Sequence, residues 1–438
     1  MHSTTNDDVA AAIAAAAERE AVTSLGFLRD LIGLARQGED AIQDFVAANL
    51  RELGCRIEEL HYRPAEVALV EEFAAGHAIP PRERRSVIGI LPGSGAGRSL
   101  MLFAHPDPEP ISGLENWRRD PFAATTESGR LYGWGAADDL AGVAMMVQGL
   151  RVALAAGIKP AGNITLASTP SKQHARGVAA VLHNGYRADA AVYLHPAESG
   201  IGMQEIKAFA PGQLEFRITI TGRLPETQEP AHTAFAHLAV NPLEKAWIVC
   251  RALYDLDRQR GQRVQHPALQ AAIGRSTNLQ VSTIHCGDAE RLSRIDSRCV
   301  LGCALSFPPP ERLENVMQEV ESAIREAADS DAWLRETPPK VEWIAGVGAA
   351  ETAPDAPLYR LVAEAVTAET GIAPRINPLH TASDIRNPII QQGMPTVGLG
   401  PLCGNLTMAG GQDEWVDIAD FHRAVRVTAN IIARWPMA

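Results

Sequence analysis

The chain reads SLMLFAHPDPEP at residues 99–110 and GRLYGWGAADDLAG at residues 129–142. The five apolar residues 100–104 are too few for a helix, so they predict a buried parallel strand. His105 and Asp107 follow the end of that strand, which faces the ligand crevice in open α/β sheets. An imidazole with a carboxylate two residues further on suits a metal ligand and the group that orients it.

A second carboxylate, Asp138, follows Gly133 and Gly135 at the start of a predicted helix. Apolar residues at helical spacing indicate this helix, and Gly157 is its expected end. The apolar positions are Leu140, Val143, Val147, Leu150 and Leu154.

The combined pattern resembles the family of dinuclear zinc amidohydrolases that includes aminoacylase, acetylornithine deacetylase, succinyl-diaminopimelate desuccinylase and carboxypeptidase G. Its members show a strand followed by HxDxxP, then a W..DPF segment, then GxGxxD and a helix. The matching residues are His105 to Pro110, Trp117 to Phe122 and Gly133 to Asp138. The resemblance extends from about Phe27 to the C-terminus. It implies an α/β fold: a zinc-peptidase-like catalytic domain with a mixed sheet and an inserted ferredoxin-like α+β sandwich.

Composition excludes several classes of partner. The chain has 438 residues and a net charge of -12, without a basic cluster, so we expect neither nucleic acid nor an anionic membrane as a partner. The six cysteines are scattered and show no zinc-ribbon spacing, so we interpret them as buried thiols in a reducing compartment. No signal peptide or membrane span is visible, and the expected location is cytoplasmic.

The order of expected elements predicts three segments. Residues 1–210 are the first part of the catalytic domain, 211–331 an inserted lid and dimerisation domain, and 332–438 the second part of the catalytic domain. The insertion begins with a strand of alternating apolar and polar residues, typical of a sheet with one wet face. Expected strands cover 56–62, 87–91, 100–104, 163–168, 190–194, 214–220, 279–285, 300–307, 341–344 and 395–399. Expected helices cover 7–20, 25–36, 41–53, 140–154, a short stretch near 178, 243–256, 311–328, 355–370 and 418–435; residues 73–85 are expected as a loop or short helix.

The resemblance implies one intact metal position. Members of the family bind two zinc ions with five ligands and use a glutamate as general base. The strand-end histidine of the family matches His105, the bridging aspartate matches Asp138, and the ligand before a proline matches His195 in YLHP. Two imidazoles and a carboxylate suit zinc.

The second metal position is altered. The segment that carries the base and a ligand in the family reads TPSKQ here, with Lys172 at the base position and Gln173 at the ligand position. The segment of the last ligand reads AGGQDEWV, with Gly410 in place of histidine. An amide is a poor zinc ligand and a glycine offers no side chain. We therefore expect one zinc, or another divalent metal, per chain at most, or none.

Lys172 is the most informative departure, because an ammonium cannot accept a proton from water. Its positive charge could replace part of the missing metal beside Asp138. Alternatively, Lys172 and Asp138 form a salt bridge in an inactive site, or Lys172 is a general base or Schiff-base amine with a lowered pKa. We favour charge replacement over the covalent role.

Two further histidines and an arginine are candidates near the catalytic centre. His174 and His380 could each supply an acid/base group or a ligand, or His380 could be a loop histidine bonded to solvent. Arg386, in a segment that resembles the GGTDAR loop of the family, could bind a substrate carboxylate bidentately. Its alternative is a structural pair with Asp384.

The inserted domain contributes two candidates for substrate binding. The family carries a histidine there that reaches the reacting carbonyl across the dimer. Glu226 occupies the nominal position, and His232 in EPAHTAF could take over the role. Asn278 could contact the substrate or cap a strand.

These observations predict an enzyme that hydrolyses a small N-acyl amino acid, amide or peptide. Its substrate would be a small molecule with a carboxylate, and the chain would form a homodimer through the inserted domain. Without a proper base, a lyase, an isomerase or an acyl transferase is an alternative. A catalytically inactive binding protein is the other, because a fold alone does not establish a function.

Overall fold

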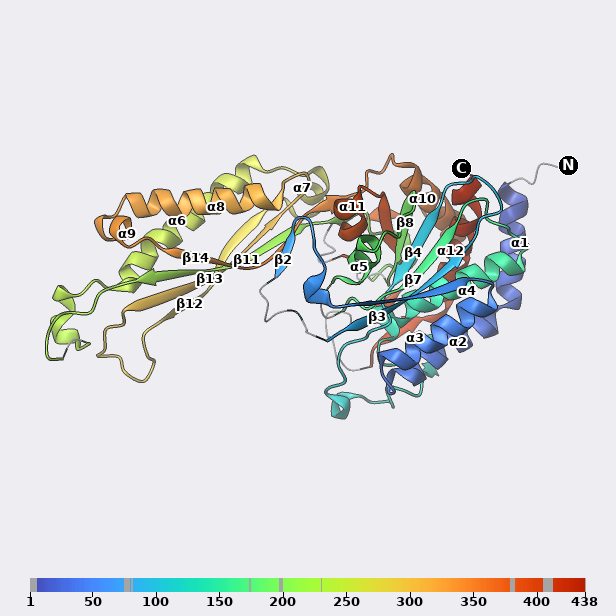
Figure 1. The fold of residues 1–438 in the computed structure, drawn as a ribbon, viewed down its shortest axis with the longest axis horizontal. Helices are drawn as coiled ribbons and strands as arrows, with labels where there is room; N and C mark the ends of the chain where they lie inside the picture. Colours follow the sequence, from blue (N-terminus) through green and yellow to red (C-terminus); the bar gives the residue numbers. More distant parts are fainter. Residues whose placement is uncertain are drawn as a thin grey trace. The chain divides into compact units, whose positions relative to one another are not determined.

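The computed structural model describes residues 6–74, 79, 82–172, 175–196, 200–229, 231–378, 383–404 and 413–437. The chain divides into two compact units (Figure 1). The first unit comprises residues 1–68, 77–209 and 351–438, and the second unit comprises residues 69–76 and 210–350.

A six-stranded mixed sheet forms the centre of the first unit. Its four strands β7, β4, β8 and β17 run parallel, whereas β1 and β3 pair antiparallel at one side. This arrangement confirms the predicted mixed α/β sheet. In spatial order the strands are β1 (Arg56–Tyr62), β3 (Arg84–Leu91), β7 (Ile164–Ser168), β4 (Leu100–Ala104), β8 (Ala190–Leu194) and β17 (Thr396–Leu399).

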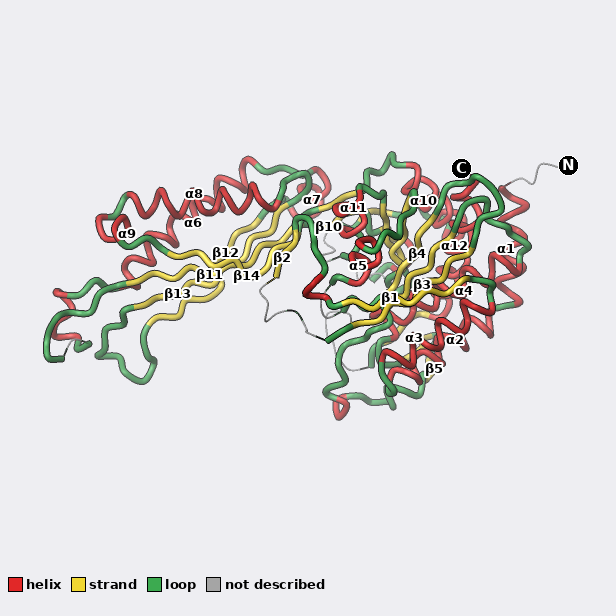
Figure 2. Tube along the Cα trace, in the orientation of Figure 1, coloured by secondary structure: helices red, strands yellow, loops and turns green. Residues whose placement is uncertain are grey.

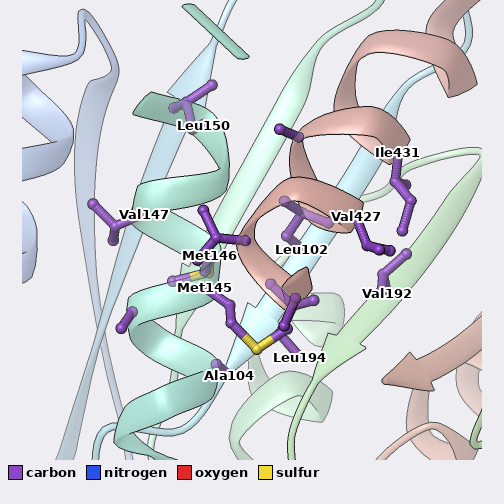
Figure 3. Close-up of a cluster of buried hydrophobic side chains, with 14 of the residues drawn as sticks. Leu102, Ala104, Met145, Met146, Val147, Leu150, Val192, Leu194, Val427 and Ile431 are labelled. Atoms are coloured by element: carbon purple, nitrogen blue, oxygen red, sulfur yellow. The ribbon is translucent and has the colours of Figure 1, made fainter. Parts of the chain in front are cut away.

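Helices of the first unit pack against this sheet, and the central one, α4 (Ala141–Ala155), is almost completely buried. Its apolar residues contact side chains of β4, β8 and α12 (Figure 3). A helix that is apolar on all sides is stable only inside a core, which explains its position. The other helices are α1 (Asn6–Arg19), α2 (Ala21–Ala35), α3 (Glu39–Glu52), α5 (Gly177–His183), α10 (Pro357–Thr370), α11 (Arg386–Gln392) and α12 (Ile418–Arg434).

Short strands complete the first unit. A small four-stranded sheet has the order β18-β19-β6-β5 and lies in the segments that lead to α4 and α12. Among the described residues, no helix combines the length and the apolar character needed to cross a lipid bilayer. The short strands are β5 (Thr125–Glu127), β6 (Arg130–Tyr132), β9 (Glu205–Ile206), β10 (Phe209–Ala210), β15 (Ala350–Glu351), β16 (Arg375–Ile376), β18 (Cys403–Gly404) and β19 (Trp415–Asp417).

The second unit is an antiparallel five-stranded sheet with helices on one face (Figure 2). Strand β11 alternates buried and exposed residues, and its buried side chains share a core with α6 and α8. The predicted α+β sandwich is therefore confirmed. The strands in spatial order are β12 (Asn278–Cys286), β13 (Arg298–Phe307), β11 (Gly212–Thr221), β14 (Lys340–Val347) and β2 (Glu72–Ala74); the helices are α6 (Pro242–Arg263), α7 (Pro267–Ile273), α8 (Leu313–Asp329) and α9 (Ala332–Glu336).

Two segment boundaries differ from the expected ones. Strand β14 pairs with β11 in the sheet of the second unit, so the chain returns to the first unit at residue 351 rather than at 332. Strand β2, within a stretch expected to be loop or short helix, pairs with β14. Alternation of apolar and polar residues predicts a strand but not the sheet that it joins, because the pairing partners are distant in sequence.

The contact between α4 and β8 yields a prediction about stability. A methyl group on Gly142 would overlap the carbonyl oxygen of Leu194 and the carboxylate of Asp139. We expect Gly142→Ala to lower the free energy of unfolding by about 3 kcal/mol, because backbone atoms of a packed strand cannot move aside. Gly26→Ala, in helix α2, is the control, since nothing lies within 4 Å of its added methyl group. It should raise stability by about 0.5–1 kcal/mol in the same urea titrations, and equal effects of the two variants would contradict the prediction.

Candidate functional site

Three side chains converge at one edge of the central sheet. His105 follows β4, His195 follows the neighbouring strand β8, and Asp138 lies in the turn of residues 136–140 that leads into α4. Asp138 Oδ1 lies 3.0 Å from His105 Nε2 and 3.3 Å from His195 Nε2. One ligand atom from each residue lies within 4.8 Å of the others. The sequence-predicted ligand set is thus brought together, because parallel strands present their carboxyl ends at the same edge.

The backbone of the Asp138 loop is held by a residue that the sequence analysis did not single out. The carboxylate of Glu414 accepts hydrogen bonds from the amides of Gly135 at 2.9 Å, Ala137 at 2.6 Å and Asp138 at 3.0 Å. Burial raises the pKa of Glu414 to about 7. Gly135 has a φ of 72°, a conformation that favours glycine. Glu414 therefore fixes the position from which Asp138 reaches the histidines.

Asp107 orients its neighbours. It accepts hydrogen bonds from Arg84 at 2.9 Å, from the amide of Ser171 at 2.8 Å and from the amide of Lys172 at 3.1 Å. Its Oδ1 also lies 3.5 Å from His105 Nδ1. Asp107 and its partner Arg84 are buried. These contacts agree with the orienting role that the sequence analysis expects of Asp107.

Lys172 contacts the other oxygen of Asp138. Its Nζ is paired with Asp138 Oδ2 and lies 3.4 Å from Glu109 Oε1. Burial lowers the pKa of Lys172, but the carboxylates of Asp138 and Glu109 outweigh this effect and raise it. These surroundings favour the charged form of Lys172 and do not support the alternative of a lysine with a lowered pKa. Glu109 stands in the HPDPEP stretch itself and could have been recognised there.

Lys207 is a second lysine at the site, and the sequence analysis missed it. It is 1% exposed, and its Nζ lies 2.6 Å from His195 Nδ1 and 2.6 Å from the carbonyl oxygen of Pro196. Burial and the charge of Lys207 lower the pKa of His195 to about 4. The sequence shows Lys207 only as a single lysine between apolar residues. That pattern does not reveal that His195 is its partner.

The two histidines differ in their electrostatic surroundings. Burial lowers the pKa of His105, but its hydrogen bonds with Asp107 and Asp138 outweigh burial and hold the pKa well above the usual value. Burial raises the pKa of Asp138, yet the hydrogen bonds with His105 and His195 keep it well below the usual value. Asp138 is therefore an ionised carboxylate surrounded by donors.

The other predicted residues of the first unit either form structural contacts or lie outside the described residues. Arg386 is buried, donates to the carbonyl of Ser383 at 3.1 Å and lies 3.6 Å from Asp384 Oδ1. These contacts agree with the alternative that Arg386 forms a structural pair with Asp384. His174 and His380 lie outside the described residues, as do Gln173 and Gly410.

The two candidates of the inserted segment belong to the second unit. His232 Nδ1 accepts a hydrogen bond from the amide of Ala234 at 3.0 Å, so the ring caps a short turn. Asn278 is the exposed first residue of β12 and lies opposite Ser306. The contact of His232 is therefore structural. The position of Asn278 agrees with the alternative that it caps a strand.

The donor chemistry of His105, Asp138 and His195 fits one divalent cation. Two imidazole nitrogens and a carboxylate oxygen are a common zinc donor set, and the three groups are close and largely buried. The second oxygen of Asp138, by contrast, is already paired with an ammonium.

The contacts of Glu414 lead to a prediction. We expect Glu414→Gln to lower the free energy of unfolding by about 1.5–3 kcal/mol, because an amide group cannot accept all three buried N–H bonds. Glu127→Gln is the control, since Glu127 pairs with Arg119 at the surface and such pairs contribute little. Denaturant titration of both variants measures the difference, and equal stabilities would refute the role given to Glu414.

Comparisons with known proteins agree with this geometry. Residues 101–434 match the model of Peptidase family M20/M25/M40. The chain is 24% identical over 307 residues to an N-formyl-4-amino-5-aminomethyl-2-methylpyrimidine deformylase from Bacillus subtilis, covering 69% of this chain and 66% of that protein. It is 28% identical over 371 residues to a succinyl-diaminopimelate desuccinylase from Leptothrix cholodnii, covering 82% of this chain and 85% of that protein.

A solved structure shares the fold. An M20 family metallo-carboxypeptidase from Sulfolobus solfataricus superposes with a TM-score of 0.66 at 16% identity, over 96% of this chain and 99% of that one. The resemblance drawn from the HxD, W..DPF and GxGxxD motifs is confirmed. The chain belongs to Peptidase family M20/M25/M40, whose members hydrolyse amide and peptide bonds.

Proposed function

We propose that this protein is a divergent M20 amidohydrolase that acts on a small N-acyl amino acid, amide or peptide. Two of its relatives are named a deformylase and a desuccinylase, so each is named for removing an acyl group. We extend the cleavage of this class of bond to this chain. We do not extend to it the formyl or the succinyl group for which the two relatives are named. We assign no role in the proposed activity to Arg386, whose buried guanidinium donates to the carbonyl of Ser383.

One divalent cation would be held by His105, Asp138 and His195. When bound there, it would supply a Lewis acid that polarises the carbonyl of the scissile bond. Asp107 would keep the His105 ring in place, because its carboxylate is itself fixed by Arg84 and by two backbone amides. Such outer partners orient metal ligands and tune them.

The contact between Lys172 and Asp138 Oδ2 carries the proposal about the altered centre. The two imidazoles face Oδ1 while the ammonium faces Oδ2, so the carboxylate separates the ring nitrogens from the charge of Lys172. We assign to Lys172 the charge of the missing second metal. A fixed ammonium in a partly buried site stabilises negative charge that develops on a substrate oxygen.

A lysine at this position also favours a second candidate class. Because the pKa of Lys172 is raised, it holds its proton and cannot act as the base that activates water. A lyase, an isomerase or an acyl transferase would not need that base in the same role. A binding protein without turnover is the remaining alternative.

The metal assignment predicts stoichiometry. At saturating zinc, followed by removal of unbound metal, we expect about one zinc per chain by elemental analysis, and its loss in His195→Ala. His183→Ala, at the exposed end of α5, is the matched control and should retain the metal. Two zinc ions per chain, or undiminished zinc in His195→Ala, would contradict the assignment.

The role of Lys172 predicts activity. Zinc-loaded protein should release amine from at least one member of a panel of N-formyl, N-acetyl and N-succinyl amino acids and dipeptides. Lys172→Met should lower kcat about a hundredfold with little change in zinc content, because a preorganised charge is lost. The exposed Lys159→Met is the control. Zinc binding without hydrolysis of any panel member would favour the non-hydrolytic class, and an unaffected kcat in Lys172→Met would refute its role.

A further inference from the structure

Both ring nitrogens of His195 have partners. Nε2 lies 3.3 Å from Asp138 Oδ1, and Nδ1 lies 2.6 Å from Lys207 Nζ. The carbonyl oxygen of Pro196 is also close to both groups, 2.6 Å from Nζ and 3.0 Å from Nδ1. His195 and Lys207 are both buried, so water does not compete for these contacts.

The chemistry of these partners decides where the neutral ring carries its hydrogen. An ammonium offers three donors and no acceptor, so Nδ1 can only accept from Lys207. The hydrogen of the ring is then on Nε2, where the Asp138 carboxylate accepts it. A histidine that binds a metal is arranged the other way round: its free nitrogen donates to a carbonyl or carboxylate, and the ligating nitrogen carries no hydrogen.

We propose that Lys207 is a positioning residue that favours the His195 tautomer with its hydrogen on Nε2 and thereby weakens cation binding at the His105–Asp138–His195 group. This inference rests on the proposed function, since it concerns the cation assigned there. The charge of Lys207 acts in the same direction, because an ammonium in contact with a ligand ring repels a divalent cation.

The structure also contains the partner for the opposite tautomer. The carbonyl of Pro196 lies within hydrogen-bonding distance of Nδ1 and could accept a hydrogen from it. Lys207 therefore competes with this carbonyl for Nδ1. Removing the ammonium leaves the arrangement typical of a ligating histidine, with Nε2 free to face a cation.

Zinc titrations against a chromophoric chelator test the proposal on the full-length apo protein. Lys207→Met removes the charge and keeps the length of the side chain, whereas Lys207→Gln offers an amide oxygen that can accept from Nδ1. We expect both variants to bind zinc about ten- to a hundredfold more tightly than the unmodified protein, the range found for outer partners of metal ligands. Lys245→Met is the control, since Lys245 pairs with Asp331 at 2.7 Å in the second unit.

A second measurement does not require any metal. Histidine ¹⁵N NMR of the apo protein, with the His195 signals assigned from their loss in His195→Gln, should show the hydrogen on Nε2 in the unmodified protein and on Nδ1 in Lys207→Met. Unchanged zinc affinity in both folded variants, or a hydrogen on Nδ1 in the unmodified protein, would overturn the inference. If no protein binds zinc, the metal assignment of the proposed function fails, and the NMR result alone decides the role of Lys207.

Discussion

The candidate site depends on compensation of one buried carboxylate. Asp138 is ionised although it is largely removed from water, and an isolated charge in that position would cost several kcal/mol. Two imidazoles face one of its oxygens and an ammonium faces the other. The compensation of this one carboxylate therefore depends on side chains from three other parts of the chain.

Strand ends and buried hydrogen bonds together fix the position of Asp138. The ends of β4 and β8 bring the two histidines together, and the turn before α4 carries Asp138. Glu414 holds the loop amides, while Asp107 joins Arg84 to the backbone at Ser171. Because these bonds are buried and charge-assisted, each is stronger than a neutral surface bond. These contacts within the first unit therefore fix the positions of the side chains in the cluster.

Family membership and the altered residues address different questions. The match over residues 101–434 establishes the family. The identity of Lys172 concerns the chemistry of this member, since a family's scaffold persists while the groups on it change. Lys172 and Lys207 contact different members of the cluster. Lys172 contacts Asp138, and Lys207 contacts His195. Together they make the site more positive than the three ligand residues alone would.

Local patterns in the sequence determined much of the result. The strands at 56–62, 100–104 and 190–194 were predicted with their observed bounds, because short apolar or alternating runs reflect local burial. The resemblance to the family implied the proximity of His105, Asp138 and His195, and that of Lys172 to Asp138. Only the tertiary structure decided that β14 joins the second sheet, that Lys207 contacts His195 and that Arg386 is buried. These choices depend on partners distant in sequence, and a buried lysine or arginine cannot be told from an exposed one until its surroundings are assembled.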